Sequence, residues 1–128
     1  MSSANAYIRN GFGAVRAYIY GSLDLLDFVT QVFGAEELER GETPGGIHVD
    51  VKIGDSAMDL ELGELPAEAT HSSVYVYVPD VDAAYQRALQ AGATSLAEPE
   101  DKPYLDRGAG VRDSSGNIWW IGTYLGPQ

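Results

Sequence analysis

A strand–helix segment occurs twice in this chain and restricts its possible folds more than any other feature. Residues 18–20 and 75–77 read YIY and YVY, and residues 34–35 and 92–93 both read GA. The offset between the copies is almost the same at both ends, so the whole segment is repeated. This repetition predicts a duplicated strand–helix unit.

The second copy shows both elements. Val and Tyr alternate from Val74 to Val78, which predicts a strand with one apolar face. Pro79 ends the strand because it has no backbone N–H to donate. Asp80 or Asp82 can cap the following helix, and Gly92 can end it.

The first copy predicts a strand over residues 14–20 and a helix over residues 23–33. Val15 belongs to the expected apolar face of that strand, together with Ala17 and Ile19. Ser22 is the expected N-terminal cap of the helix. The preceding residues 1–10 show no periodicity and are expected to form a loose arm.

Two hairpins complete the pattern. In the first half, apolar and polar residues alternate over 48–53 and 57–62, on either side of a turn at Gly54-Asp55. Residues 41–46 have the composition of a turn. Residues 36–40 are either a strand or a loop. In the second half we expect a short strand over 93–97, a charged loop over 98–106 and a hairpin of 108–112 with 117–124, turned at 113–116. The chain is therefore predicted to be one α+β domain, residues 1–128, with two βαβββ units of about 12–62 and 72–125 that form a curved mixed sheet with helices on its outer face.

Charge and composition exclude some partners. Nineteen acidic and eight basic residues give a net charge of −11, which repels nucleic acid; it attracts cations or serves only solubility. No stretch is long enough to span a membrane, no signal-peptide pattern is present and cysteine is absent. We therefore expect no membrane partner and a cytoplasmic location.

Three segments resemble the glyoxalase, bleomycin-resistance and extradiol-dioxygenase superfamily, also called the vicinal oxygen chelate proteins. They are DFVTQVFGAEE at residues 27–37, VYVPDVDAAYQRALQAGA at 76–93 and PYLDRGAGVRDSSGNIWWI at 103–121. The resemblance covers residues 11–124 and implies paired βαβββ units. The chain departs from the family pattern at two places. It has Leu105 where the family has Gly, and Ser114-Ser115 where the family has Pro-Phe.

The resemblance also implies where a divalent metal would be held. Enzymes of the family use four side chains, and the corresponding positions here are Ala14 or Arg16, Asp59, Ser73 and Trp120. Only Asp59 is a strong ligand, whereas a catalytic metal needs about three protein ligands. We therefore expect that the metal site is lost and that the protein has no cofactor.

Residues with the same strand parity as these positions should face the cup that the family forms. This rule predicts the ligand-binding residues Arg16, Tyr18, Tyr20, His48, Asp50, Asp59, Glu61, Ser73, Tyr75, Tyr77 and Trp120. Tyrosines, a tryptophan and carboxylates suit a cationic or aromatic ligand. The alternative is that this face is only the solvated side of a sheet. His48 is either a general base or metal ligand or a solvated residue, and Arg107 either closes over the cup or forms a surface ion pair.

These inferences predict a metal-independent small-molecule-binding protein of the bleomycin-resistance kind rather than an enzyme. The alternative is a divergent lyase, isomerase or dioxygenase whose metal uses nonstandard ligands such as His48, Asp50, Asp59 and Glu61. A third possibility is an interaction module without a ligand. Members of the family of this size usually dimerise, with each cup built from one unit of each chain, so we expect a homodimer.

Overall fold

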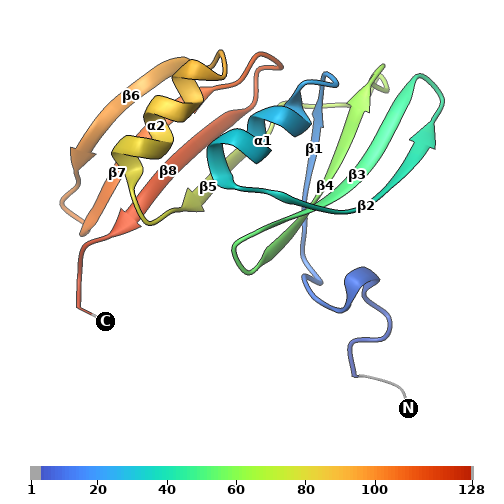
Figure 1. The fold of residues 1–128 in the computed structure, drawn as a ribbon, viewed down its shortest axis with the longest axis horizontal. Helices are drawn as coiled ribbons and strands as arrows, with labels where there is room; N and C mark the ends of the chain where they lie inside the picture. Colours follow the sequence, from blue (N-terminus) through green and yellow to red (C-terminus); the bar gives the residue numbers. More distant parts are fainter. Residues whose placement is uncertain (1–3, 128) are drawn as a thin grey trace.

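The computed structural model describes residues 4–127 (Figure 1). Part of the arm predicted over residues 1–10 lies outside this range. The described part of that arm forms turns and a short 3₁₀-helix, η1 (Arg9–Gly11). No described helix has the length and apolar character that crossing a bilayer requires.

The chain folds as two βαβββ units, each with its own four-stranded mixed sheet (Figure 1). The first unit contains β1 (Ala17–Gly21), α1 (Leu25–Phe33), β2 (Glu36–Thr43), β3 (Gly46–Ile53) and β4 (Ser56–Gly63). The second contains β5 (Ser73–Tyr77), α2 (Val81–Gln90), β6 (Thr94–Asp101), β7 (Asp106–Arg112) and β8 (Ile118–Tyr124). The strand orders are β1-β4-β3-β2 and β5-β8-β7-β6; β1 and β5 pair in parallel with β4 and β8, and the other pairs are antiparallel. This is the α+β architecture of paired βαβββ units that the sequence pattern predicts, and it is the glyoxalase-like fold that the family resemblance implies.

Most of the predicted end signals act as expected. Asp80 is the N-cap of α2, and its side chain accepts a hydrogen bond from the Ala83 N–H at 3.1 Å. Gly34 follows α1 with a φ of 67° and Gly92 follows α2 with a φ of 99°, a backbone region that L-residues avoid. Local residue chemistry thus sets these boundaries.

The two helices lie side by side, and one core runs beneath both (Figure 1). Trp119 of β8 is fully buried, with its ring centroid 6.0 Å from Phe28 and 5.3 Å from Phe33. The Arg87 guanidinium of α2 donates to the Val32 carbonyl of α1. Helix α1 of the first unit therefore packs against a strand of the second, which joins the units.

A buried polar turn also joins the units. Asp113 accepts hydrogen bonds from the Asn117 N–H at 3.0 Å and from the Trp119 indole N–H at 2.8 Å. The Asn117 amide donates to the Tyr20 carbonyl at 2.9 Å and accepts from the Ser72 N–H at 2.8 Å. Because every buried polar group here has a partner, the network fixes the turn rather than destabilising it.

The start of the first unit differs from the prediction. Val15 was expected on the apolar face, but β1 begins only at Ala17 and Val15 is 94% exposed. Gly13, with a φ of 76°, redirects the chain just before this point. Ser22 is not the helix cap either: α1 begins at Leu25 with Asp24 as N-cap, and the Ser22 hydroxyl instead donates to Asp24.

Two polar strands are longer than predicted. Strand β2 continues to Thr43, so only the end of the turn expected over residues 41–46 is a turn. Strand β6 continues to Asp101, through much of the loop expected over residues 98–106. Both are edge strands, and pairing with β3 and β7 holds them despite their lack of apolar alternation.

Candidate functional site

Strand register brings the predicted polar residues of the first unit onto one face of its sheet. Asp59 on β4 lies opposite Tyr18 on β1 and Asp50 on β3, and Glu61 lies opposite Tyr20 and His48. The intervening residues of β3 and β4 point the other way into the core and are buried. We refer to this polar side as the first face.

Arg16 anchors the first face from the segment before β1. Its Nη1 lies 3.2 Å from Asp59 Oδ1 and 4.0 Å from Asp50 Oδ2, and all three side chains are largely buried. The same guanidinium donates to the backbone carbonyls of Gly13, Phe12 and Arg9. One cation therefore contacts both carboxylates and holds the N-terminal arm against the sheet.

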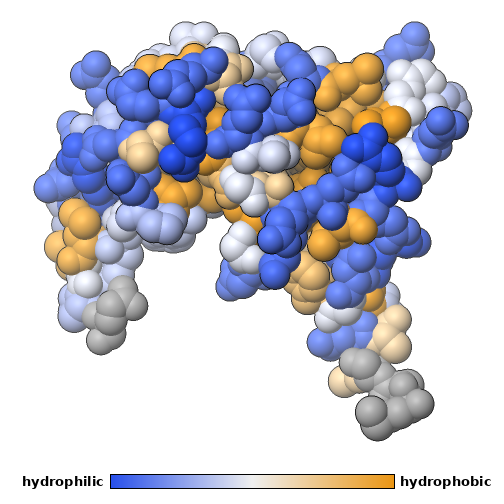
Figure 2. Space-filling view, in the orientation of Figure 1, coloured by the Kyte–Doolittle hydropathy of each residue, from blue (hydrophilic) through white to orange (hydrophobic). Residues whose placement is uncertain are grey.

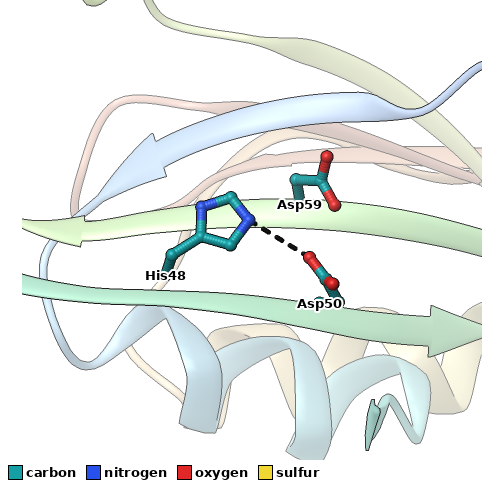
Figure 3. Close-up of side chains that lie close together, drawn as sticks. All are labelled: His48, Asp50 and Asp59. Carbon is teal, nitrogen blue, oxygen red and sulfur yellow. Dashed lines mark hydrogen bonds and ion pairs between the residues drawn. The ribbon is translucent and has the colours of Figure 1, made fainter. Parts of the chain in front are cut away.

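His48 lies between two carboxylates. Its Nε2 is 3.1 Å from Asp50 Oδ1 and its Nδ1 is 2.9 Å from Glu61 Oε1 (the Asp50 contact is drawn in Figure 3). A neutral imidazole has only one N–H, so full pairing with two ionised carboxylates requires the charged form. Partial burial alone would lower the pKa of His48, but the hydrogen bonds to Glu61 and Asp50 outweigh it and raise that pKa above its ordinary value.

Two further groups of the first face have shifted pKa values. Burial, followed by the neighbouring Asp59, raises the pKa of Asp50, although His48 acts in the opposite direction. Burial and the hydrogen bond to Glu61 raise the pKa of Tyr18 to about 12. Tyr18 therefore stays protonated and donates to Glu61 at 3.1 Å.

A cleft of about 710 Å³ opens between the arm and the first sheet. The arm contributes residues 7–9, and the segment between the arm and β1 contributes residues 13–14 and 16. Strand β2 contributes residues 39–42. His48, Asp50 and Asp59 form its inner wall, and Figure 3 shows their side chains turned toward one another. Of the predicted ligand-binding residues, these three and Arg16 line this cleft.

The second unit presents a different arrangement, which we call the second face. The hydroxyls of Tyr75 and Tyr77 on β5 both donate to Asp106 Oδ2, at 2.7 and 2.9 Å. Asp106 is only 4% exposed, and it was missed because sequence reasoning placed it at the end of a loop. The family-like segment over residues 103–121 was the signal that could have found it.

Trp120 completes the second face. It lies opposite Tyr75 in the β5–β8 register, and its indole N–H donates to the Ser73 hydroxyl at 3.1 Å. A Cβ on Gly110 would lie 2.5 Å from the Trp120 ring, and one on Gly122 would lie 2.2 Å from the Tyr75 hydroxyl. The two glycines therefore let both aromatic side chains lie close against the sheet.

The predicted residues divide between these two faces within one chain. Arg16, Tyr18, His48, Asp50, Asp59 and Glu61 form a connected network, and the second face contains Ser73, Tyr75, Tyr77 and Trp120. Tyr20 packs beside Tyr18 with ring centroids 5.4 Å apart, and both line a second cleft near Pro66 together with Glu61. Arg107 pairs with Asp82 and Asp101, so it forms the surface ion pair and does not cover a cup.

The four positions that correspond to the metal ligands of family enzymes do not fit a metal here. Asp59 is paired with Arg16, and Ser73 with Trp120, so each potential donor already has a partner within the set. A guanidinium always carries a positive charge and an indole N–H only donates, so neither can ligate a metal. A second group shares Asp59 with this set and adds His48 and Asp50, and its ligand atoms lie within 4.8 Å of one another.

Two mycobacterial relatives match 76% of this chain. It is 34% identical to an uncharacterized protein of Mycobacterium bovis (strain ATCC BAA-935 / AF2122/97), over 76% of this chain and 72% of that protein. It is equally similar to an uncharacterized protein of Mycobacterium tuberculosis (strain ATCC 25618 / H37Rv), over 76% of this chain and 65% of that protein.

Solved structures with the same fold include TioX from Micromonospora sp. ML1, with a TM-score of 0.67 and 27% identity over 88% of this chain and 100% of that one. TnmS3, an antibiotic binding protein from Streptomyces sp. CB03234, has a TM-score of 0.64 and 19% identity over 87% and 96%. A family enzyme from Burkholderia phytofirmans PsJN has a TM-score of 0.66 and 21% identity over 89% and 100%.

The family model described as Glyoxalase/Bleomycin resistance protein/Dioxygenase superfamily matches residues 24–121. That range contains both helices, strands β2 to β7 and the first part of β8, together with the turn from Asp113 to Asn117. With its paired βαβββ units, this chain belongs to the glyoxalase/bleomycin resistance protein/dioxygenase superfamily.

Proposed function

We propose that this chain is a small-molecule-binding protein of the bleomycin-resistance kind that takes a cationic or aromatic ligand without a metal. The observation that carries the proposal is the pairing of Arg16 with Asp59 and of Trp120 with Ser73. A ligand in this cup meets aromatic rings and carboxylates rather than an electrophilic metal.

One of the solved structures is in keeping with the binding of a small molecule. TnmS3 is an antibiotic binding protein, and it shares the fold across nearly the whole chain. An antibiotic-sized organic molecule is also compatible with the 710 Å³ cleft, since drug-sized ligands occupy pockets of roughly 300–1,000 Å³.

The binding unit in this proposal is a cytoplasmic homodimer. Within one chain the two units form an arch with an open hollow between its ends, and apolar surface shows along the junction of the units (Figure 2). A second copy would bring the first face of one chain opposite the second face of the other, so that each cup is complete. Sedimentation at micromolar concentration should give a dimer; a monomer there would contradict this arrangement.

A ligand screen read by tryptophan fluorescence tests the binding proposal. Trp119 is fully buried whereas Trp120 is partly exposed, so a ligand in the cup should quench Trp120 alone. Aromatic cations and neutral aromatic compounds should quench the wild type, and Trp120→Phe should lose the response. A screen of both classes without any saturable binding would contradict the proposal.

A second candidate rests on the cluster of His48, Asp50 and Asp59, which could bind a divalent metal in a divergent lyase, isomerase or dioxygenase. In that case Arg16 would have to move from Asp59 and His48 from Asp50. Elemental analysis after metal-supplemented expression separates the two candidates. About one Zn, Ni, Mn or Fe per chain would favour the second, and less than about a tenth of that would favour the first.

A further inference from the structure

Asp106 is a buried carboxylate without a cationic partner in the part of the chain that the structure describes. No Lys, Arg or His side chain among residues 4–127 lies within ion-pair distance of it. Its basic neighbours are engaged elsewhere: Arg107 with Asp82 and Asp101, and Lys102 with Glu100. Buried charges are normally paired with an opposite charge, and Asp106 has no such counter-charge among residues 4–127.

Asp106 instead lies at the hydroxyl ends of two aromatic side chains. The rings of Tyr75 and Tyr77 have centroids 5.2 Å apart and planes inclined by 53°, and their hydroxyls share one carboxylate oxygen. Both side chains remain open to solvent, at 41% and 62% exposed. A hydroxyl that donates to a carboxylate increases the electron density of its ring, and electron-rich rings attract cations more strongly.

Tyr75 and Tyr77 stay protonated across the physiological pH range. Burial and the hydrogen bond to Asp106 raise the pKa of Tyr75 above its ordinary value. The hydrogen bond to Asp106 and partial desolvation raise the pKa of Tyr77 as well, with further contributions from Tyr104 and Tyr124. Tyr124 lies opposite Asp106 in the β7–β8 register, which enlarges the aromatic surface around that carboxylate.

We propose that the second face is an ammonium-binding subsite, in which the rings of Tyr75 and Tyr77 contact an alkylated ammonium group and Asp106 supplies the buried counter-charge. This inference rests on the proposed ligand-binding function and specifies its ligand as an organic cation. Trp120, opposite Tyr75, lies where an aromatic part of the same ligand would stack.

The first face is a weaker candidate for the same cation. Asp59 already pairs with Arg16, and Glu61 already accepts hydrogen bonds from Tyr18 and contacts His48. A ligand cation there would have to compete with an internal one at close range. At Asp106 it would meet two neutral phenols and would break no ion pair of that carboxylate. The Lys102 side chain crosses the neighbouring Gly108, but its ammonium group pairs with Glu100. Charge complementarity therefore favours the second face.

The test uses phenyltrimethylammonium as the probe and 2-phenyl-2-propanol, which has a similar shape without the charge, as its matched comparison. Titration of the full chain by NMR should show binding of the cation at least tenfold tighter than binding of the alcohol. Intermolecular NOEs should connect the trimethyl protons to the rings of Tyr75 and Tyr77, assigned through the single Tyr→Phe variants.

Asp106→Asn should weaken binding of the cation about tenfold and leave binding of the alcohol nearly unchanged. Tyr77→Phe keeps the ring and removes the hydroxyl, so it should weaken binding of the cation about threefold. The control, Glu98→Gln, removes an exposed carboxylate from β6 of the same unit and should change affinity less than twofold. If thermal unfolding shows that Asp106→Asn does not fold, Tyr77→Phe with the NOE pattern decides the question.

Three outcomes would overturn the inference. If Asp106→Asn binds the cation as the wild type does while Asp59→Asn does not bind it, the ammonium group lies on the first face and only the proposed function stands. Equal affinity for the cation and the alcohol would mean that the protein binds aromatic ligands but has no ammonium-binding subsite. Absence of binding by both probes and by the wider ligand screen would remove the inference and the proposed function together.

Discussion

The two faces of this molecule share a strand topology but treat their charges differently. The first face holds three carboxylates, Asp50, Asp59 and Glu61, and brings its own cations, Arg16 and His48, into contact with them. The second face holds one buried carboxylate, Asp106, and gives it only two phenols. The duplicated framework therefore carries one electrostatically closed face and one open face.

The difference shows how a repeated unit can separate stability from binding. Removing a partner from a closed, partly buried network leaves an uncompensated charge and destabilises the fold. Removing a partner from the open face removes a hydrogen bond but no internal ion pair. Loss of a cation from the first face should therefore cost more stability than loss of a phenol from the second face, and loss of a second-face group should also lower ligand affinity.

The largest effect is expected for Arg16→Ala. The substitution leaves Asp50 and Asp59 without their cation and removes the donor to the backbone carbonyls of Phe12 and Gly13. The free energy of unfolding should therefore fall by about 2–4 kcal/mol. Urea denaturation measures this change. Arg9→Ala, which breaks the exposed pair with Glu39, is the control and should cost less than about 1 kcal/mol. Equal costs for both variants would mean that the first face is not a closed network.

A smaller effect, dependent on pH, is expected for His48. Its pKa is raised in the folded state, so its stabilising contribution is complete below the ordinary value and is lost as the pH rises through the folded-state value. The raised pKa of Asp50 also makes stability fall with rising pH, but it acts from its ordinary value of 3.8 upward. His48→Gln should cost about 1–2 kcal/mol at pH 6.

Urea denaturation between pH 6 and 9 checks this expectation. The wild type should lose stability over that interval, and His48→Gln should lose less. Tyr75 and Tyr77 should not titrate in that interval, because their pKa values are raised above the ordinary value of 10.0. A variant with the same pH profile as the wild type would show that His48 is not charged in the folded protein.

Loss of a single tyrosine hydroxyl should lower stability more on the second face than on the first. Tyr75→Phe removes one of the two donors to the buried Asp106 and should cost about 1 kcal/mol. Tyr18→Phe should cost about 0–0.5 kcal/mol, since Glu61 keeps its contact with His48 and Tyr18 is more exposed to water. Thermal unfolding of the two variants side by side gives the comparison; the reverse order would contradict it.

The smallest effect concerns the residue before Asp106. Leu105 has a φ of 68°, in the left-handed region that costs an L-residue roughly 1–2 kcal/mol, and the family pattern has Gly at this position. Leu105→Gly should therefore raise stability by about 0.5 kcal/mol after the entropy of glycine is subtracted. Leu105→Ala keeps the strained backbone and should show no gain. A loss of stability on Leu105→Gly would mean that its side chain contributes more than its backbone costs.

Local sequence signals were enough for the framework of this protein. Strand alternation predicted which side of β3 and β4 is buried, and Asp80, Gly34 and Gly92 marked helix ends correctly. The repeat and the family-like segments predicted the paired βαβββ architecture that the structure has. Such signals succeed because side-chain periodicity and capping act within a few residues.

Tertiary structure decided what these signals do not encode. The polar strands β2 and β6 exist because β3 and β7 supply their hydrogen-bond partners. Arg16 lies 43 residues from Asp59, and Asp106 lies 31 and 29 residues from Tyr75 and Tyr77, so no local pattern pairs them. The difference between a closed face and an open face arises from contacts between distant strands, and such contacts exist only once the sheets have formed.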